Sequence, residues 1–282
     1  MKILSSIKKD VEFNKGLYSL IEILKNIAIA QYRSLERKVK PYEKLNMAID
    51  SFFELIKVSE VSHPFLKPKN NSQIVIAITS DAGLLGGLNT RVIAAAINEL
   101  EKMPGPLIVI GERGKVYAQE SNIPFVNFAG IEDEQRHLQA MRLRDYVMDR
   151  LLKESIGCLK IVYPRALSLS AQKVEIMPLL PYARADKKTI SEETRGDIII
   201  ESNPGDIVEY LIHLWIGGLL DEIFGLSRLA EFAARFVHLE ESSQKLKDME
   251  KTLRLQYFRA RHELIDCNMR ELFAARMLYA NK

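Results

Sequence analysis

The stretch IVIAITSDAGLLGGLNTRVIAAAINELEK, residues 74–102, places an aliphatic run, a glycine-rich turn and a periodic segment in direct succession. Its opening residues, IVIAITS, form a nearly continuous apolar run, which is typical of a strand buried on both faces of a sheet. Residues 88–102 have helical periodicity. A strand that passes through glycines into a helix is also where nucleotide-binding α/β proteins hold phosphate groups. The stretch therefore predicts the first strand and helix of a Rossmann-like domain, and it raises the question of a bound nucleotide.

The turn itself lacks the residues that phosphate binding requires. It contains no lysine, and its glycines fall as G-x-x-G-G, which matches neither the Walker A loop nor the G-x-G-x-x-G fingerprint. We therefore interpret Asp81, Gly83, Gly86, Gly87 and Asn89 as a structural turn, in which glycine permits tight bending and close backbone approach.

Catalytic and metal-binding groups are equally sparse. Asp81 follows a strand, where α/β enzymes often place catalytic groups, but no histidine or lysine lies near it in sequence. The five histidines and the two cysteines, Cys158 and Cys267, have no metal-ligand spacing. We expect no catalytic residue, no metal site and no cofactor.

The pattern of strand and helix continues on the carboxyl side of the turn. Strands are predicted at 107–110, near Phe125, at 158–167 and at 172–181, and helices at 112–120 and 137–154. Alternating strands and helices imply a sheet with a parallel core and helices on both faces. Residues 72–200 are therefore predicted to form a Rossmann-like α/β domain.

Long helices are predicted on both sides of this domain. In the N-terminal segment, 1–62, helical signal runs from about residue 13 to 58, with a bend near Pro41 because proline lacks the backbone donor. In the C-terminal segment, 204–280, Asn203 can cap a helix that starts at Pro204, although Gly217 and Gly218 could loosen it. The predicted stripes are Leu17, Leu20, Leu24 and Ile27 in the first segment, and Leu246, Met249, Leu253, Tyr257, Ala260, Leu264 and Cys267 in the second.

Such stripes fit either ordinary core-facing helices or a coiled coil. Length favours the coiled coil, since apolar residues of the C-terminal segment continue at roughly helical spacing over more than about 40 residues, whereas an average globular helix has about 11 or 12. The predicted fold class is therefore α/β, with an antiparallel coiled coil of long N- and C-terminal helices around an inserted Rossmann-like α/β domain.

Composition limits the partners. The 282 residues carry a formal net charge of only +3, which is far from the concentrated positive surface of a nucleic-acid-binding protein. The longest apolar stretch, residues 210–220, is too short to span a bilayer, and the N-terminus has no signal-peptide pattern. We expect a cytoplasmic protein. The charges on the last helix are intermixed, which favours a solvated face, although Arg259, Arg261 and Arg270 could meet an acidic partner.

Several motifs resemble the γ subunit of rotary F-type ATP synthases. TSDAGLLGGLN is similar to the family's S-D-x-G-L-x-G-G-L-N signature, and VIGERG to its V-I-G-x-x-G. EFAARF resembles S-E-x-x-A-R-M, and LRLQYFRARHELI resembles L-x-L-x-Y-N-R-x-R-Q-x-x-I. The resemblance covers essentially the whole chain.

The resemblance implies a central-stalk rotor subunit. In that family the coiled coil stands inside a ring of alternating α and β subunits (α3β3). The inserted α/β domain lies with the ε subunit on the membrane-embedded c-ring. Rotation of the shaft changes each catalytic β subunit in turn, so ion flow is coupled to ATP synthesis or hydrolysis, and the nucleotides are bound by the partners. The expected location is the cytoplasmic face of the bacterial inner membrane, with membrane contact only through the complex. Lys25, Arg235 and Arg261 are the partner-contact residues that carry over.

Some positions depart from the family pattern. Leu24 replaces a methionine, and the sequence of this region more closely resembles that of the γ subunit of the alternative N-type F-ATPases. Three residues differ from the family at the predicted tip of the coiled coil, where Phe258, His262 and Asp266 replace asparagine, glutamine and threonine. An altered contact with the catalytic subunit is therefore expected. Two alternatives remain: a nucleotide-binding regulator or enzyme that uses the Rossmann-like domain, and a stand-alone coiled-coil adaptor.

Overall fold

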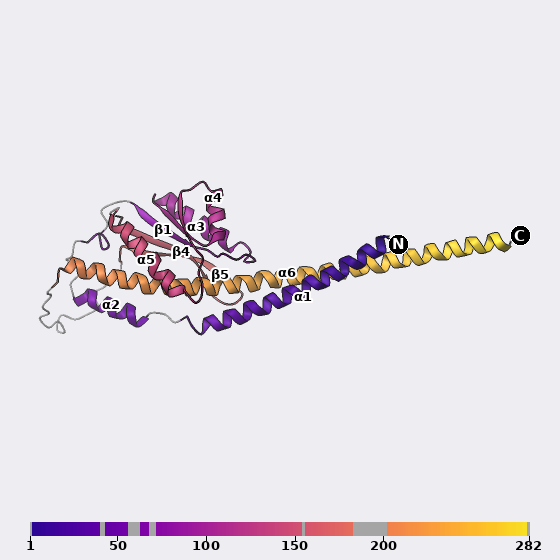
Figure 1. Cartoon of the computed structure of the whole chain (residues 1–282), viewed down its shortest axis with the longest axis horizontal. Coiled ribbons are helices and arrows are strands. Elements are labelled where there is room, and N and C mark those ends of the chain that lie inside the picture. The colour runs from indigo at the N-terminus through magenta and orange to yellow at the C-terminus, as the bar shows by residue number, and fades with distance from the viewer. Residues whose placement is uncertain are drawn as a thin grey trace. The chain divides into compact units, whose positions relative to one another are not determined.

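The computed structural model describes residues 2–39, 43–55, 63–67, 72–153, 156–182 and 202–280 (Figure 1). The chain divides into two compact units, 30–235 and a second unit formed by 1–29 together with 236–282. We call them the α/β unit and the two-helix unit. No helix in the described ranges is long and apolar enough to cross a membrane. The elements are α1 (Lys2–Glu36), α2 (Glu43–Leu55), β1 (Gln73–Ile78), α3 (Leu88–Lys102), β2 (Leu107–Ile110), α4 (Glu112–Glu120), β3 (Phe125–Phe128), α5 (Arg136–Lys153), β4 (Cys158–Ala166), β5 (Gln172–Leu180) and α6 (Pro204–Ala280).

The α/β unit is built on a five-stranded sheet in the order β3-β2-β1-β4-β5. Strands β1 to β4 pair in parallel, and β5 pairs antiparallel to β4. The predicted parallel core and helix-covered faces are confirmed. Strand β2 and helix α4 fall at the predicted residues, because short aliphatic runs between turn residues leave little choice of boundary.

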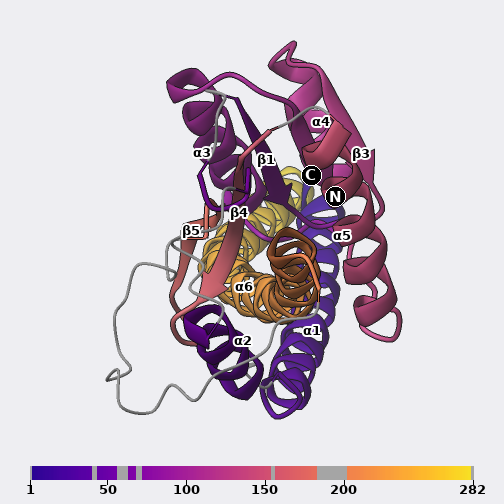
Figure 2. The same cartoon turned by 90° about the vertical axis from the view of Figure 1, so that its left-hand side faces the viewer.

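The two faces of the sheet carry different side chains. In β1, Ile74, Ile76 and Ile78 pack into one core, while Val75 and Ala77 pack into the other. The smaller residues meet α3, and the isoleucines meet α5 and the first part of α6 (Figure 2). Because successive side chains of a strand point to opposite faces, this alternation decides which helices lie on which face.

The first part of α6 belongs to the α/β unit. Ile212, Ile216 and Leu220 are buried in the same core as the isoleucines of β1. Asn203 begins the helix as predicted, since its Oδ1 accepts a hydrogen bond of 3.0 Å from the backbone N–H of Gly205. Helix α6 continues through Gly217 and Gly218 without a break, so the loosening expected there is wrong. A Cβ at Gly217 would lie 3.0 Å from the side chains of Met141 and Arg144, so this glycine allows close packing of α6 on α5.

The division of the chain into segments 1–62, 72–200 and 204–280 stays a prediction. In the structure, the compact α/β unit includes residues 30–235 and therefore contains parts of both long helices. The expected break between the first two helices lies between the end of α1 at Glu36 and the start of α2 at Glu43, and Pro41 lies outside the described residues.

In the two-helix unit, α1 and α6 run antiparallel. Asn14 Nδ2 donates to the backbone carbonyl of Leu246 at 3.0 Å, and Lys25 Nζ lies 2.8 Å from Glu240 Oε2. The residue number of the contact on α6 therefore falls as the residue number on α1 rises, which is the pattern of an antiparallel pair. Within this unit α6 continues past the N-terminal end of α1 (Figure 1).

The register of this pairing corrects part of the prediction. The less exposed positions of α1 follow alternating spacings of three and four residues, a heptad pattern that starts earlier than the predicted residue 13. Of the four residues expected in the stripe, Leu17 and Leu24 are half-buried, whereas Leu20 and Ile27 are exposed. The seam of α1 consists of Leu4, Ile7, Val11, Asn14, Tyr18, Ile21, Lys25 and Ala28.

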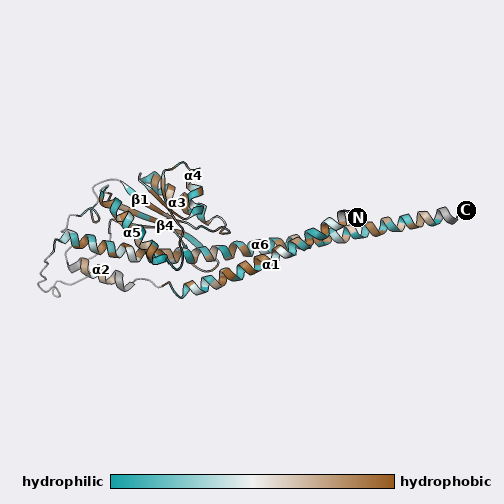
Figure 3. Cartoon of the chain, viewed as in Figure 1, coloured by the Kyte–Doolittle hydropathy of each residue, from teal (hydrophilic) through white to brown (hydrophobic). Residues whose placement is uncertain are grey.

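The seam of α6 is also partly different. Leu246, Leu253, Tyr257, Ala260 and Leu264 lie in it as predicted, but Met249 is 54% exposed and Cys267 is exposed. Glu250 occupies the seam position that was assigned to Met249. Polar and apolar residues alternate along both helices of this unit (Figure 3). An apolar pattern alone cannot reveal a seam that includes Asn14, Lys25 and Glu250.

Candidate functional site

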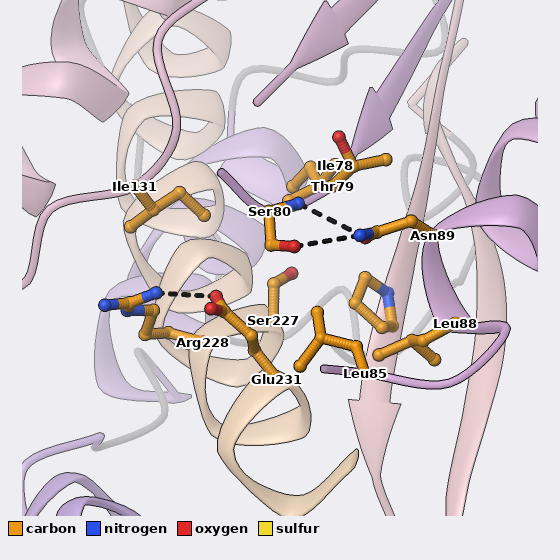
Figure 4. A pocket seen from close by; sticks show the side chains of 11 residues that line it. Ile78, Thr79, Ser80, Leu85, Leu88, Asn89, Ile131, Ser227, Arg228 and Glu231 are labelled. Atoms are coloured by element: carbon orange, nitrogen blue, oxygen red, sulfur yellow. Dashed lines mark hydrogen bonds and ion pairs between the residues drawn. The ribbon is translucent and has the colours of Figure 1, made fainter. Parts of the chain in front are cut away.

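The glycine-rich turn after β1 is closed by its own side chains. Asn89, on the first turn of α3, donates from Nδ2 to Ser80 Oγ at 2.9 Å and accepts from the backbone N–H of Ser80 at 3.3 Å (Figure 4). Ser80 Oγ donates to the carbonyl of Ala82 at 2.8 Å. The polar residues of the turn therefore bind one another.

The backbone N–H groups at the start of α4 donate hydrogen bonds to two further side chains at the beginning of the turn. Asp81 Oδ1 accepts a 2.8 Å hydrogen bond from the backbone N–H of Glu112, and Thr79 Oγ1 accepts one of 3.1 Å from Gly114. The backbone N–H of Arg113 donates to the carbonyl of Ser80 at 3.0 Å. These are orphan donors of a helix N-terminus, which in a nucleotide-binding protein would be available to a phosphate. Here Asp81 acts as a helix cap.

The three glycines of the turn have different surroundings. Gly86 has φ of +59°, a conformation that favours glycine, whereas the neighbouring positive φ of +65° falls on Leu84. A Cβ at Gly83 would lie 3.4 Å from the Arg113 guanidinium, and one at Gly87 would meet nothing within 4 Å. Gly86 is thus the glycine of this turn that the backbone conformation itself explains.

The space beside the turn is acidic. A cleft of about 360 Å³ is lined by Asp81, Ala82, Ile131, Glu132, Asp133, Glu134, Arg228 and Glu231. Five carboxylates against one guanidinium would repel the phosphates of a nucleotide. The geometry therefore gives no support to a nucleotide at the place where a Rossmann-like fold would hold one.

Arg235, a predicted partner contact, lies on α6 beside a second arginine that sequence reasoning missed. Arg235 Nη2 binds Glu231 Oε1 at 2.7 Å, and Arg228 Nη1 binds Glu231 Oε2 at 2.6 Å. Arg228 also reaches Asp133 at 3.1 Å. Burial lowers the pKa of Arg228, but the carboxylates of Glu231 and Asp133 outweigh burial, so its pKa lies above the usual value. Glu231 and Arg228 stand three residues apart, a spacing that could have signalled the pair.

Lys25, the second predicted contact, is engaged inside the two-helix unit. Its Nζ lies 2.8 Å from Glu22 Oε1 and 2.8 Å from Glu240 Oε2, and its side chain is only 14% exposed. Ser243 Oγ donates to Glu22 Oε1 at 2.7 Å. The hydrogen bond from Lys25, followed by that from Ser243, holds the pKa of Glu22 below its ordinary value. The pKa of Lys25 is raised by the hydrogen bonds to Glu22 and Glu240.

Arg261, the third predicted contact, is different from the other two. It is exposed on α6, and it makes no ion pair within the described part of the chain. The altered tip residues, Phe258, His262 and Asp266, are exposed on the same helix. The structure thus brings Lys25 and Arg235 into internal ion pairs and leaves Arg261 open to solvent.

Metal-ligating side chains are not clustered in the part of the chain that the structure describes. No group of three or more histidine, cysteine or acidic side chains there could hold a metal ion. Cys158 and Cys267 are both free thiols.

Comparison with known proteins gives the family. Residues 4–275 match the sequence profile of the ATP synthase family. The chain belongs to the ATP synthase family. The match extends over both units, so it includes the glycine turn and most of both helices of the two-helix unit.

Relatives within the ATP synthase family match nearly end to end. An ATP synthase gamma chain from Picosynechococcus is 25% identical, and the alignment covers 97% of this chain and 98% of the relative. One from Mycoplasmopsis synoviae is 26% identical over 86% of each chain. Among solved structures, a chain of the Euglena gracilis mitochondrial ATP synthase (OSCP/F1/c-ring) has a TM-score of 0.71 at 18% identity, covering 98% of this chain and 94% of that one. The last likeness confirms the fold, with its long terminal helices and central sheet.

Proposed function

We propose that the chain is the central-stalk rotor subunit of a rotary ATP synthase or ATPase, which couples ion translocation through a c-ring to conformational change in the catalytic β subunits. The observation that carries the proposal is the family match over residues 4–275, which extends over both terminal helices and the inserted α/β unit. The chain itself is non-catalytic, in keeping with its relatives, which are ATP synthase gamma chains.

The surface of the two-helix unit supports a surrounding partner. On α1, the side chains of Phe13, Leu20, Ile23 and Ile27 are exposed, with Phe13 73% exposed. On α6, residues 265–276 are all exposed and include Ile265, Met269, Leu272 and Phe273. Large exposed apolar side chains on one element mark an interaction site. We infer that α and β subunits, arranged as α3β3, cover these faces.

The remaining partners are assigned to the α/β unit. We infer that it contacts the ε subunit and the c-ring, and that the chain meets the membrane only through the complex. A chain of the Euglena gracilis rotor covers 94% of this chain at a TM-score of 0.66, which supports a common fold. The chain is a peripheral part of a membrane complex, and we place it on the cytoplasmic face of a bacterial inner membrane.

The three cations divide into two roles under this proposal. Arg261 is exposed and without an internal ion pair among the described residues, so it is the strongest candidate for a contact with a catalytic subunit. Lys25 and Arg235 already bind carboxylates of this chain, and a partner would have to compete with those carboxylates. Membership of the N-type subgroup stays a prediction that rests on the sequence around Leu24.

The alternative function, a nucleotide-binding regulator, can be tested on the isolated chain. The acidic cleft and the occupied donors at the start of α4 argue against it. Isothermal titration with ATP and ADP should give no binding at micromolar nucleotide, and a micromolar dissociation constant would favour the regulator instead.

The decisive experiment is co-expression of the chain with α and β subunits from the same genome. We expect one copy of the chain for three αβ pairs, with ATPase activity that depends on its presence. A chain that stays soluble and monomeric and does not co-purify with α and β would overturn the rotor assignment. A stable homodimer without partners would support the coiled-coil adaptor.

A further inference from the structure

Ser227, on the part of α6 that belongs to the α/β unit, is buried in an unusual way. Its side chain is 3% exposed, yet its hydroxyl has no hydrogen-bond partner among the described residues. A serine within a helix commonly donates to the carbonyl four residues earlier. Ser51 and Ser242 both do so in this chain, at 2.7 and 2.8 Å. The hydroxyl of Ser227 is therefore directed away from its own helix.

The hydroxyl of Ser227 points into a small cavity between α6 and the glycine turn, whose mostly apolar lining also holds the polar side chains of Ser80 and Asn89. Figure 4 shows it directed toward the hydrogen-bonded pair of Ser80 and Asn89. The water-accessible volume of this cavity is about 10 Å³. That volume suits about one water molecule and is far below what any nucleotide or organic ligand needs.

Three polar atoms of the lining have unused hydrogen-bond donors or acceptors that a water molecule could bind. Ser80 Oγ donates to Ala82 and accepts from Asn89 Nδ2, so one of its lone pairs remains. Asn89 Oδ1 accepts one hydrogen bond, from the backbone N–H of Ser80, and can accept another. Ser227 supplies a donor. A buried water typically makes about three hydrogen bonds, and these three atoms can supply them.

We propose that this cavity is a binding site for one ordered water molecule that joins α6 to the glycine turn. The water oxygen accepts a hydrogen bond from the Ser227 hydroxyl, and the water donates hydrogen bonds to Ser80 Oγ and Asn89 Oδ1. In this arrangement the serine and the asparagine of the turn have a second role besides closing the turn, since they also fasten it to the long helix. The proposal does not depend on the rotor function.

The sign of a stability change distinguishes a wet cavity from a dry one. An unpartnered buried hydroxyl destabilises a protein, so its removal from a dry cavity would raise stability, whereas removal of a water ligand lowers it. The test is Ser227→Ala in the full chain, measured by urea unfolding. Ser242→Ala is the matched control, because it has the same gain in helix propensity on the same helix.

We expect Ser227→Ala to lower the folding equilibrium constant about three- to tenfold relative to Ser242→Ala. A higher folding equilibrium constant for Ser227→Ala than for Ser242→Ala would overturn the proposal. A second measurement holds even if the variant fails to fold: a structure of the intact wild-type complex at a resolution where ordered waters are visible. Density for one water bonded to Ser227, Ser80 and Asn89 would support the site, and a cavity without that density would exclude it.

Discussion

The α/β unit and the two-helix unit bury their side chains to very different extents. The α/β unit has cores on both faces of its sheet, in which Ile74, Ile76 and Phe224 are at most 2% exposed. The two-helix unit has one seam, interrupted by Asn14 and Lys25, and leaves Phe13 on its surface. The α/β unit covers these apolar side chains within the chain itself, whereas the two-helix unit leaves apolar side chains open to a partner. The same substitution should therefore have different effects in the two units.

The largest contrast is expected for phenylalanine truncation. Phe224→Ala, in the core of the α/β unit, should lower the free energy of unfolding by about 3–5 kcal/mol because it leaves a cavity. Phe13→Ala, on the exposed face of α1, should change it by less than about 0.5 kcal/mol in the isolated chain. Urea unfolding followed by the fluorescence of Trp215, which packs in the core of the α/β unit, measures the first change, and circular dichroism measures the second. Equal losses for the two variants would contradict the comparison.

Glycine substitution should give opposite signs in the two units. Gly111 has φ of +99°, and a Cβ there would lie 2.7 Å from the Thr79 carbonyl oxygen, so Gly111→Ala should cost about 2–4 kcal/mol of stability. Gly16 lies inside α1, where a Cβ would meet nothing within 4 Å. Gly16→Ala should raise stability by about 0.5–1 kcal/mol, since alanine favours helix. Thermal unfolding of the two variants measures both changes, and a loss of stability in Gly16→Ala would show an unrecognised contact at that position.

Sequence reasoning succeeded where one physical requirement dominated. The strand at 107–110 and the start of α6 at Pro204 were predictable because an aliphatic run and a cap leave one solution each. The buried face of α1 was only partly predicted, because Asn14 and Lys25 lie in its seam, and polar residues there are explained only by their partners on α6. Likewise, the glycine turn could be recognised as structural, but its link to α4 through Asp81 requires knowledge of which strands are neighbours.

Acid should weaken the pairing in the two-helix unit. Because the folded-state pKa of Glu22 lies below its ordinary value of 4.5, its contribution to stability is complete above that value and is lost as pH falls through the folded-state pKa. Lys25 has the opposite shift, and its contribution is lost only at high pH, above its ordinary pKa. The protection factors of the backbone amides at residues 14–28, which correct for the pH dependence of intrinsic exchange, should therefore fall below pH 4.5. Glu22→Gln should make this acid response smaller, whereas Glu12→Gln, at an exposed position of the same helix, should leave it unchanged.

The smallest effect on stability, and the most informative one for function, is expected at Arg261. Arg261→Ala should leave the unfolding free energy within about 0.5 kcal/mol of the wild type, because the side chain is exposed and makes no internal ion pair with described residues. In a complex reconstituted with α and β, the same variant should weaken assembly or ATP-driven ion pumping, since a charge that contacts a partner is lost. Lys251→Ala is the control: it removes a positive charge from the same helix, but that charge already pairs with Asp248 at 3.1 Å. If both variants pump as the wild type does, Arg261 has no partner contact, and the altered residues Phe258, His262 and Asp266 become the next positions to test.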